Sequence, residues 1–529
     1  MSINHSPALR DAMLKPDFYP HPVETVTLRE THISTVFLTG QFVYKIKKAV
    51  DLGFLDFSSL EKRHAGCQQE LILNRRLSSG VYLEILPITC RDHRYALNGS
   101  GPVVEFAVKM HQLRDRDAMS HLLSTGRFQE ARMTGLIQRL VDFYANAAID
   151  RSPPDADVPA WQDNLDHVDR LIGPDARATF EFVKSASQAF FNRHAKLFQR
   201  RHRAGRIRDC HGDLRCDHIY FTDTGIQIID CIEFSRALRV LDVVCDLAFL
   251  AMDLTFRGRS DLARHLIRQY IDASGDLGAL PLLDFYCCYR AMVRCKVSLL
   301  RLCEKDVPLP ERQAVQKTAT GTLSLARAYA GNFSRPILWI VCGLPASGKS
   351  TLAAALAEVW DLAVIRSDAV RKALFADDAP PAGDAAFEKG IYSALATEMT
   401  YREVLAMADE TLKKGLSVIV DATFSRRLQR NQAMRLAGAR QVAIVLVECR
   451  AAESVIARRL RRRETEPSLS DARLIHLEAF KKRFAPIEPT DDARHIVVDT
   501  GQPVDTCLRR IMLADPLWNH LNQQGGPHV

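Results

Sequence analysis

Hydrophobic and polar positions follow an α/β pattern in the C-terminal part of the chain. Short apolar runs rich in β-branched residues alternate there with longer stretches of helical periodicity. This alternation predicts a parallel sheet covered by helices on both faces, with ligands bound at the carboxyl ends of the strands. The expected strands are 337–340, 362–365, 417–420, 442–447 and 495–498, and the expected helices are 352–360, 368–375, 387–414, 426–437, 452–464, 470–483 and 504–512.

The N-terminal part opens with a different pattern. Three short segments rich in β-branched and aromatic residues, with turn residues between two of them, predict an antiparallel meander. Helical periodicity over 59–77 and 311–330, further helix over 270–302, and one more strand over 103–110 complete the expected elements. Gly, Asn and Pro within 331–336 predict a linker between two domains, because these residues interrupt helices. The three meander segments are 23–28, 33–38 and 42–46.

Composition narrows the class of protein. With 529 residues the chain is too long for one core, and 47% hydrophobic and 25% charged residues are typical of a globular protein. The formal net charge of +8 is modest for this length and does not by itself indicate a nucleic-acid partner. Thirteen cysteines without a C-x-x-C pair favour free thiols and a reducing compartment. No run has the length of a signal peptide or a membrane span, so we expect a cytoplasmic protein without a membrane partner.

The most specific motif follows the apolar run 337–340. Gly343-x-x-x-x-Gly348-Lys349-Ser350 lies between a predicted strand and a predicted helix, the context in which such a sequence forms a phosphate-binding loop. Backbone N–H groups of the loop attract phosphate, Lys349 reaches the β- and γ-phosphates, and Ser350 binds Mg²⁺. The sequence therefore predicts a site for ATP and Mg²⁺. Its expected nucleotide-binding residues are Gly343, Leu344, Pro345, Ala346, Ser347, Gly348, Lys349, Ser350 and Thr351.

Further charged residues follow the predicted strands of this part. Asp368 and Arg371 are one helical turn apart, so they are expected to supply a base and a cation for the acceptor, with Ser367 or Asp368 as helix cap. Asp421 ends an apolar strand and is expected to join the Mg²⁺ shell. In the arginine-rich helix 452–464, Arg459 and Arg463 are expected to close on the triphosphate and to stabilise developing charge.

The N-terminal part carries a second set of kinase-like signals. Lys45 on a strand and Glu70 on a helix form the type of pair that holds the α- and β-phosphates in kinase-like folds. A His-x-Asp loop ending at Asp213 precedes an apolar strand that leads to Asp230. In phosphotransferases this order supplies an aspartate for the acceptor hydroxyl and another for Mg²⁺.

Residues 23–301 resemble the aminoglycoside phosphotransferase (choline-kinase-like) family on the strength of these motifs. The family's loop matches at His211, Gly212 and Asp213, but His218 stands where the family has Asn. The resemblance implies a bilobal kinase-like fold in which Asp230, with His218 in the Asn position, binds the metal. Asp246 matches a helix-start aspartate of the family and is expected to act as a cap. An active kinase and a nucleotide-binding or substrate-binding regulator both remain open, because imidazole suits Mg²⁺ poorly.

Residues 336–517 resemble the P-loop kinases grouped with polynucleotide kinase and the zeta toxins. The whole chain resembles bacterial bifunctional aminoglycoside phosphotransferase/ATP-binding proteins. The resemblance implies a kinase-like (α+β) domain at 1–305, a helix and linker at 306–336, a P-loop (α/β) AAA-type domain at 337–517 and a disordered tail at 518–529.

We therefore predict an ATP-dependent kinase that acts on a hydroxyl of a small metabolite, nucleotide or nucleic acid, with the chemistry mainly in the P-loop domain. One alternative is a nucleotide-dependent switch whose N-terminal domain is a degenerate kinase. Another is a pair of active kinase domains. The acceptor, the choice of ATP or GTP, the oligomeric state and the coupling of the domains remain open.

Overall fold

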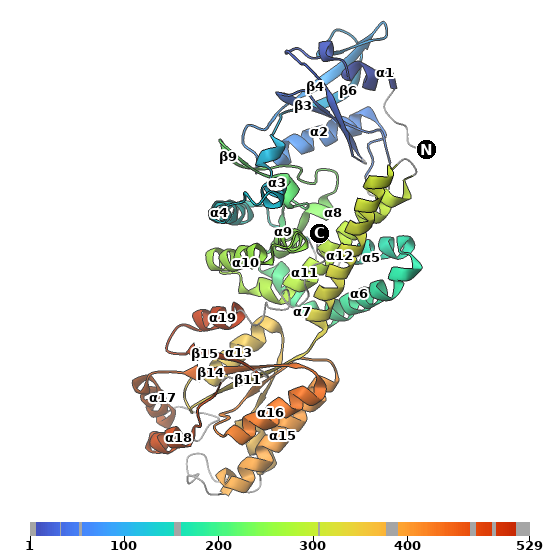
Figure 1. Ribbon diagram of the computed structural model, residues 1–529. Coiled ribbons are helices and arrows are strands. Elements are labelled where there is room, and N and C mark those ends of the chain that lie inside the picture. The colour runs from blue at the N-terminus through green and yellow to red at the C-terminus, as the bar shows by residue number, and fades with distance from the viewer. Residues whose placement is uncertain are drawn as a thin grey trace. The chain divides into compact units, whose positions relative to one another are not determined.

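The computed structural model describes residues 7–31, 33–51, 55–152, 160–304, 307–376, 390–465, 472–488 and 493–514 (Figure 1). The predicted tail at 518–529 and the starts of the predicted helices 387–414 and 470–483 lie outside these ranges. The chain divides into two compact units that alternate along the sequence. Unit 1 comprises Met1–Arg170, Gln199–Gly275 and Tyr289–Val297, and unit 2 comprises Leu171–Phe198, Asp276–Cys288 and Ser298–Val529.

Unit 1 begins with a six-stranded antiparallel sheet in the order β1-β2-β3-β6-β4-β5. The predicted strands near 33–38, 42–46 and 103–110 and the helix near 59–77 are confirmed. The predicted segment 23–28 overlaps β1 only at residues 27 and 28, and α1, β4 and β5 were not predicted. Ser59 caps helix α2 by accepting a hydrogen bond from the Lys62 N–H. The elements are α1 (Pro7–Met13), β1 (Thr27–Glu30), β2 (Ser34–Leu38), β3 (Phe42–Lys47), α2 (Leu60–Asn74), β4 (Tyr82–Arg91), β5 (Arg94–Leu97) and β6 (Val103–His111).

Apolar side chains cover both faces of this sheet. On one face Val43, Val108 and Met110 pack with Cys67 of α2, and on the other Tyr44 and the β-strand residues around it pack with α1. The alternation of inward and outward positions along β3 therefore places Lys45 and Lys47 on the same side as α2.

The rest of unit 1 is mostly helical and surrounds two short hairpin-like sheets. Helix α9 is buried at every position from Val243 to Leu254. The kinase-like arrangement is therefore confirmed, since a strand sheet with a packed helix precedes a helical part that carries the His211–Asp213 loop. The elements are α3 (Met119–Ser124), α4 (Ala131–Asn146), α5 (Ala160–Leu171), α7 (Ala195–Arg203), β7 (Ile207–Asp209), β8 (Ile219–Thr222), β9 (Gly225–Ile228), α8 (Arg236–Arg239), β10 (Val240–Asp242), α9 (Val243–Phe256) and α10 (Ser260–Ser274).

Two predicted helix boundaries are wrong. The expected helix over 270–302 is two helices, α10 and α11 (Leu280–Cys303), because Gly275 adopts φ 66° and ends α10 in a left-handed cap. The expected break at 331–336 is displaced, because α12 (Leu309–Ser334) continues through Gly331 and ends just before Pro336. Packing of α12 against α6 (Pro174–Arg193) supports the helix through its glycine.

Unit 2 contains the predicted parallel sheet, five strands in the order β12-β13-β11-β14-β15. Every neighbouring pair in it is parallel. Helices α15 and α16 cover one face and α13 and α19 cover the other (Figure 1). The elements are β11 (Ile337–Gly343), α13 (Lys349–Trp360), β12 (Ala363–Arg366), α14 (Ser367–Leu374), α15 (Ala394–Lys413), β13 (Val418–Asp421), α16 (Arg427–Arg440), β14 (Ala443–Arg450), α17 (Glu453–Thr465), α18 (Leu477–Arg483), β15 (Arg494–Asp499) and α19 (Val504–Met512).

The central strand β11 is buried from Leu338 to Gly343. Because all five strands run the same way, the segments after β11, β12, β13 and β15 emerge at one edge of the sheet. All 13 cysteines are free thiols, as predicted. Among the described residues, no helix combines the length and the apolar character needed to cross a membrane.

Candidate functional site

The loop after β11 has the backbone of an anion cradle. Gly343, Ala346 and Gly348 have φ values of 135°, 60° and 91°, which turn successive N–H groups inward. Helix α13 then starts at Lys349 without a side-chain cap, so its first N–H groups are oriented for an external acceptor. A Cβ on Gly343 would collide with the carbonyl oxygen of Cys449 on β14. The residues present therefore fit a bound polyphosphate.

Lys349 lies within this cradle. The residue is 9% exposed, and its Nζ donates to the Leu344 carbonyl oxygen at 2.8 Å. Burial lowers the pKa of Lys349, and the carboxylates of Asp421 and Asp368 oppose that shift. Both predicted carboxylates of the P-loop site therefore act electrostatically on the ammonium group.

Neighbouring elements hold the loop in place. The Thr500 hydroxyl, directly after β15, donates to the Ser347 carbonyl, and Arg459 of α17 donates to the carbonyls of Ala346 (3.3 Å) and Thr500 (2.7 Å). An apolar cluster of Ala346 with residues of α17 and α18 packs beneath these bonds. Arg459 is therefore in contact with the loop backbone itself.

The second predicted lid arginine lies near the same charges. Burial lowers the pKa of Arg463, the Asp368 carboxylate opposes that shift, and Arg459 reinforces it. The charges of Asp368 and Arg459 therefore both act on Arg463.

Ser350 and Asp421 offer a hydroxyl and a carboxylate, which are the hard oxygen ligands that Mg²⁺ prefers. Asp421 is the last residue of β13, is 5% exposed and lies 3.5 Å from Arg366 Nε. Its carboxylate also influences the Lys349 ammonium. The P-loop site therefore fits Mg²⁺ held together with nucleotide phosphates.

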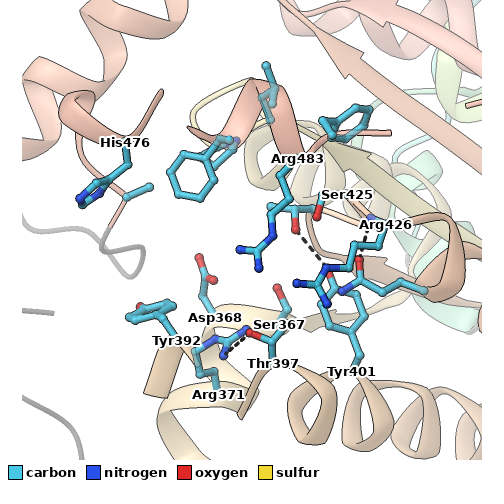
Figure 2. Close-up of a pocket in the computed structure, with 18 residues that line it drawn as sticks. Ser367, Asp368, Arg371, Tyr392, Thr397, Tyr401, Ser425, Arg426, His476 and Arg483 are labelled. Atoms are coloured by element: carbon cyan, nitrogen blue, oxygen red, sulfur yellow. Dashed lines mark hydrogen bonds between the residues drawn. The ribbon is translucent and has the colours of Figure 1, made fainter. Parts of the chain in front are cut away.

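A cavity adjoins the loop at the same edge of the sheet (Figure 2). Its walls come from the loop, from α14, α15 and α16, and from α18 with the residues flanking it. The lining residues are Gly343, Leu344, Pro345, Ser367, Asp368, Arg371, Tyr392, Thr397, Tyr401, Thr423, Ser425, Arg426, Gln429, Ala472, His476, Phe480, Arg483 and Phe484. The structure thus brings Asp368 and Arg371 to the nucleotide cradle, as the sequence predicted.

Arg371 is anchored by the wall that carries it. Its Nη1 donates to the Ile391 carbonyl at 2.5 Å and to Thr397 Oγ1 at 3.4 Å, and its guanidinium lies 5.0 Å from the Tyr392 ring centroid. Burial lowers the pKa of Arg371, and the nearby Asp368 carboxylate opposes this. The predicted cap is wrong, because α14 begins at Ser367 after Arg366 and no side chain caps it.

In unit 1 the predicted lysine–glutamate pair forms. Lys45 Nζ lies 2.8 Å from Glu70 Oε1 and 2.8 Å from Asp230 Oδ1. Burial alone would lower the pKa of Lys45, but these carboxylates hold it well above its usual value. Behind it, Lys47 pairs with Glu70 at 2.5 Å and with Glu233. The structure therefore contains a buried network in place of one isolated pair.

The loop residue Asp213 is paired with a cation of the chain. Arg215 Nε lies 3.0 Å from Asp213 Oδ1. Burial raises the pKa of Asp213, but the positive charge of Arg215 outweighs burial, so this pKa falls well below its usual value. Arg215 Nη2 also lies 3.0 Å from His218 Nε2, and His218 Nδ1 lies 2.9 Å from the Asp213 carbonyl oxygen. Guanidinium only donates and a carbonyl only accepts, so Nδ1 carries the proton and Nε2 accepts from Arg215.

This geometry does not fit the predicted role of His218 as a metal ligand. Both ring nitrogens have partners, and a lone pair directed at Arg215 is not available to a cation. A Mg²⁺ site at His218 and Asp230 is therefore not supported by the donor set.

Two aspartates of unit 1 differ from expectation. The strand before Asp230 ends at Ile228, and Asp230 adopts φ 64° in the following loop. Asp242, not Asp246, caps α9. Asp246 is fully buried and accepts from the N–H groups of His211 (3.1 Å) and Gly212 (2.8 Å). Asp246 therefore holds the His211–Asp213 loop, and the prediction that it caps a helix is wrong.

Several lining and supporting residues were not predicted. Arg215 lay within a recognised motif, and its spacing from Asp213 was the available signal. Arg426 and Arg483 lie outside any motif and become neighbours of the P-loop only through the fold.

Part of unit 2 matches a known protein family. The family described as "AAA domain" matches residues 338–487. An uncharacterized protein of Mycobacterium tuberculosis (strain H37Rv) and one of Mycobacterium bovis are each 32% identical over 498 residues, which cover 92% of this chain and 94% of theirs.

Two solved structures are more distant. A choline/ethanolamine kinase family protein of Mesorhizobium loti is 13% identical, with a TM-score of 0.36, and covers 61% of this chain and 99% of its own. A gluconokinase of Sinorhizobium meliloti is 22% identical, with a TM-score of 0.26, and covers 36% and 98%. On the full-length similarity, the chain belongs to the protein family of the two mycobacterial relatives.

Proposed function

We propose that the chain is an ATP-dependent phosphotransferase that moves the γ-phosphate of ATP to a hydroxyl group, with the chemistry in residues 337–517. One observation carries this proposal. A single cavity is lined both by Gly343, Leu344 and Pro345 of the phosphate cradle and by Asp368 and Arg371. A molecule in this cavity is adjacent to the triphosphate.

The side chains divide the work of phosphoryl transfer. Asp368 accepts the proton of the acceptor hydroxyl, and Arg371 positions the acceptor. Lys349 binds the β- and γ-phosphates, while Arg459 and Arg463 stabilise charge that develops on the transferring group.

Mg²⁺, when bound, neutralises phosphate charge, and Ser350 and Asp421 would hold it. The other cradle residues, including Ala346, Ser347, Gly348 and Thr351, bind phosphate through the backbone and the start of α13. The thirteen free thiols are compatible with a reducing, cytoplasmic setting.

For the domain at 1–305 we propose a binding role that does not transfer phosphate. The pairing of Asp213 with Arg215 supports this, because a carboxylate engaged by a guanidinium is a weak proton acceptor. Lys45 and Glu70 remain the expected contacts of a nucleotide there. Residues 306–336, which include most of α12, then connect the two domains.

The test separates transfer from nucleotide binding. Asp368→Asn removes the base but keeps the shape of the side chain, so the rate of label transfer from γ-labelled ATP should fall by ~10²–10⁴-fold while ATP affinity stays within a few-fold. Binding is measured by calorimetry on the full chain. A variant that transfers at the wild-type rate would show that Asp368 is not the base.

A further inference from the structure

The cavity beside the P-loop has an uneven charge. Three arginines, Arg371, Arg426 and Arg483, line it, and Asp368 is the only carboxylate among the described lining residues. Hydroxyl and amide groups, such as those of Thr397, Thr423 and Gln429, also line the cavity. The cavity therefore favours a polar ligand that carries negative charge.

Two of these arginines come from separate elements and meet at the same wall. Arg426 precedes α16, and Arg483 is the last residue of α18. Figure 2 shows the Arg483 side chain reaching into the cavity and facing Asp368, which comes from α14. Arg483 is thus opposite the predicted base, and Arg426 lines the same cavity.

Backbone bonds hold these two segments together. The Ala485 N–H donates to the Ser425 carbonyl at 2.8 Å, which joins the residues next to Arg483 and Arg426. The buried Arg430 donates to the carbonyls of Phe424 (2.7 Å), Ala485 (3.1 Å) and Pro486 (2.9 Å). The Arg426 N–H is fixed in turn by Gln429 Oε1 at 3.1 Å. Because the backbone on both sides is tied, Arg426 and Arg483 extend from two segments that are held together beside the cavity.

The arginines of this wall differ from those that serve the phosphates. Arg459 contacts the cradle backbone, and the charges of Asp368 and Arg459 act on Arg463. Arg371 is anchored to Ile391 and Thr397. Arg426 and Arg483 also line the cavity, and such side chains suit a planar or tetrahedral oxyanion because guanidinium binds such groups through paired N–H donors.

We propose that the acceptor is a small hydroxyl-bearing molecule with a carboxylate or phosphate group, and that Arg426 and Arg483 bind this anionic group while Asp368 faces the hydroxyl that is phosphorylated. The inference rests on the proposed phosphotransferase function. It adds the substrate class and two specificity-determining residues to that function. In the transfer step the acceptor oxygen forms a bond to the γ-phosphorus, the bond from that phosphorus to the β–γ bridging oxygen of ATP breaks, the proton passes to Asp368, and ADP leaves.

The test uses the full chain, γ-labelled ATP and a cell extract separated into a neutral small-molecule fraction, an anionic small-molecule fraction and RNA. We expect labelled product from the anionic fraction. Treating that fraction with phosphatase beforehand abolishes the product if the acceptor carries phosphate and preserves it if the acceptor carries carboxylate.

Three variants test the assigned residues with the active fraction as acceptor. Arg426→Gln and Arg483→Gln should each raise the acceptor KM by ~10–100-fold, because each removes a charged hydrogen-bond donor, with ATP affinity unchanged. Arg427→Gln is the matched control, since Arg427 does not line the cavity and pairs with Glu488 on the surface at 3.4 Å. It should leave KM unchanged. Thermal melting and ADP titration establish that each variant is folded.

The other outcomes distinguish failure of the anionic acceptor from failure of the phosphotransferase function. Product only from the neutral fraction, or an unchanged KM in both arginine variants, would overturn the anionic acceptor while the phosphotransferase function stands. Label in RNA alone would replace the small acceptor by a polynucleotide. No Lys349-dependent product in any fraction would overturn the proposed function and, with it, this inference.

Discussion

The phosphate cradle depends on a glycine that cannot be replaced without moving the sheet. Gly343 has φ 135° and ends β11, where it is in register with Cys449 of β14. In Gly343→Ala the new Cβ would lie closer to the Cys449 carbonyl oxygen than the 3.0 Å limit that real Cβ atoms respect. The strands that meet here are the two most extensively paired of the sheet interior, so neither moves freely.

The magnitude follows from two effects. A non-glycine residue at this φ costs about 1–3 kcal/mol of backbone strain. Overpacking in a well-packed core costs typically ~1–3 kcal/mol more. We therefore expect Gly343→Ala to lower the unfolding free energy of unit 2 by roughly 2–6 kcal/mol and to weaken ATP binding, because relief of the clash displaces the cradle N–H groups.

Urea unfolding measures the first effect, with the buried Trp339 of β11 as a fluorescent reporter. ADP titration calorimetry measures the second. Gly438→Ala is the matched control, because Gly438 is exposed in α16 with nothing within 4 Å of its added Cβ. It should stabilise the protein by up to about 0.5–1 kcal/mol. Wild-type stability and ADP affinity in Gly343→Ala would refute the reasoning.

Three further predictions concern other parts of the chain. Burial raises the pKa of Asp284 to about 6, above the unfolded value near 3.9. The native state therefore binds more protons than the unfolded state, and it loses stability as pH rises from ~4 to ~6. Asp284→Asn should raise the melting temperature at pH 7.5 but not at pH 4, and equal shifts at both pH values would contradict this. Asp246→Ala leaves two loop N–H groups without their acceptor, so the free energy of unfolding of unit 1 should fall by ~3–5 kcal/mol in urea unfolding. A decrease of less than about 1 kcal/mol would contradict this. The Lys349→Ala variant removes nucleotide binding at the P-loop site. In this variant the nucleotide affinity of the N-terminal site should be the same in Mg²⁺ and in EDTA, because Arg215 donates to His218 Nε2. A several-fold dependence of this affinity on Mg²⁺ would instead indicate a metal site there.

The parts of the fold that the sequence predicted well depend on local patterns. The five parallel strands follow from apolar runs interrupted by helical periodicity, and the cradle follows from the spacing of Gly343, Gly348 and Lys349. The Lys45–Glu70 pair was also predictable, because strand alternation and helix periodicity each place one partner on a face.

Other features depend on contacts that no local pattern encodes. Helix α12 passes through Gly331 because packing against α6 outweighs local propensity. Arg426 and Arg483 line one cavity only because hydrogen bonds from Arg430 and from the Ala485 N–H hold the two segments together. Such long-range hydrogen bonds have no sequence signature in a single chain.

The unit 1 loop shows a third reason. The motif predicted that Asp213 is a catalytic aspartate and that Asp246 is a cap, since both positions match a family pattern. In the structure Asp213 pairs with Arg215, and Asp246 accepts from the loop N–H groups instead of capping α9. Identity at a motif position therefore did not determine which partner each carboxylate has.

The central claim is that the P-loop half transfers phosphate and the N-terminal half does not. The most direct test is transfer of label from γ-labelled ATP into a cell-extract pool by the wild type, Lys349→Ala and Asp213→Ala. The account predicts a discrete labelled product that Lys349→Ala abolishes and Asp213→Ala leaves unchanged. Loss of a product in Asp213→Ala, or full transfer in Lys349→Ala, would contradict it.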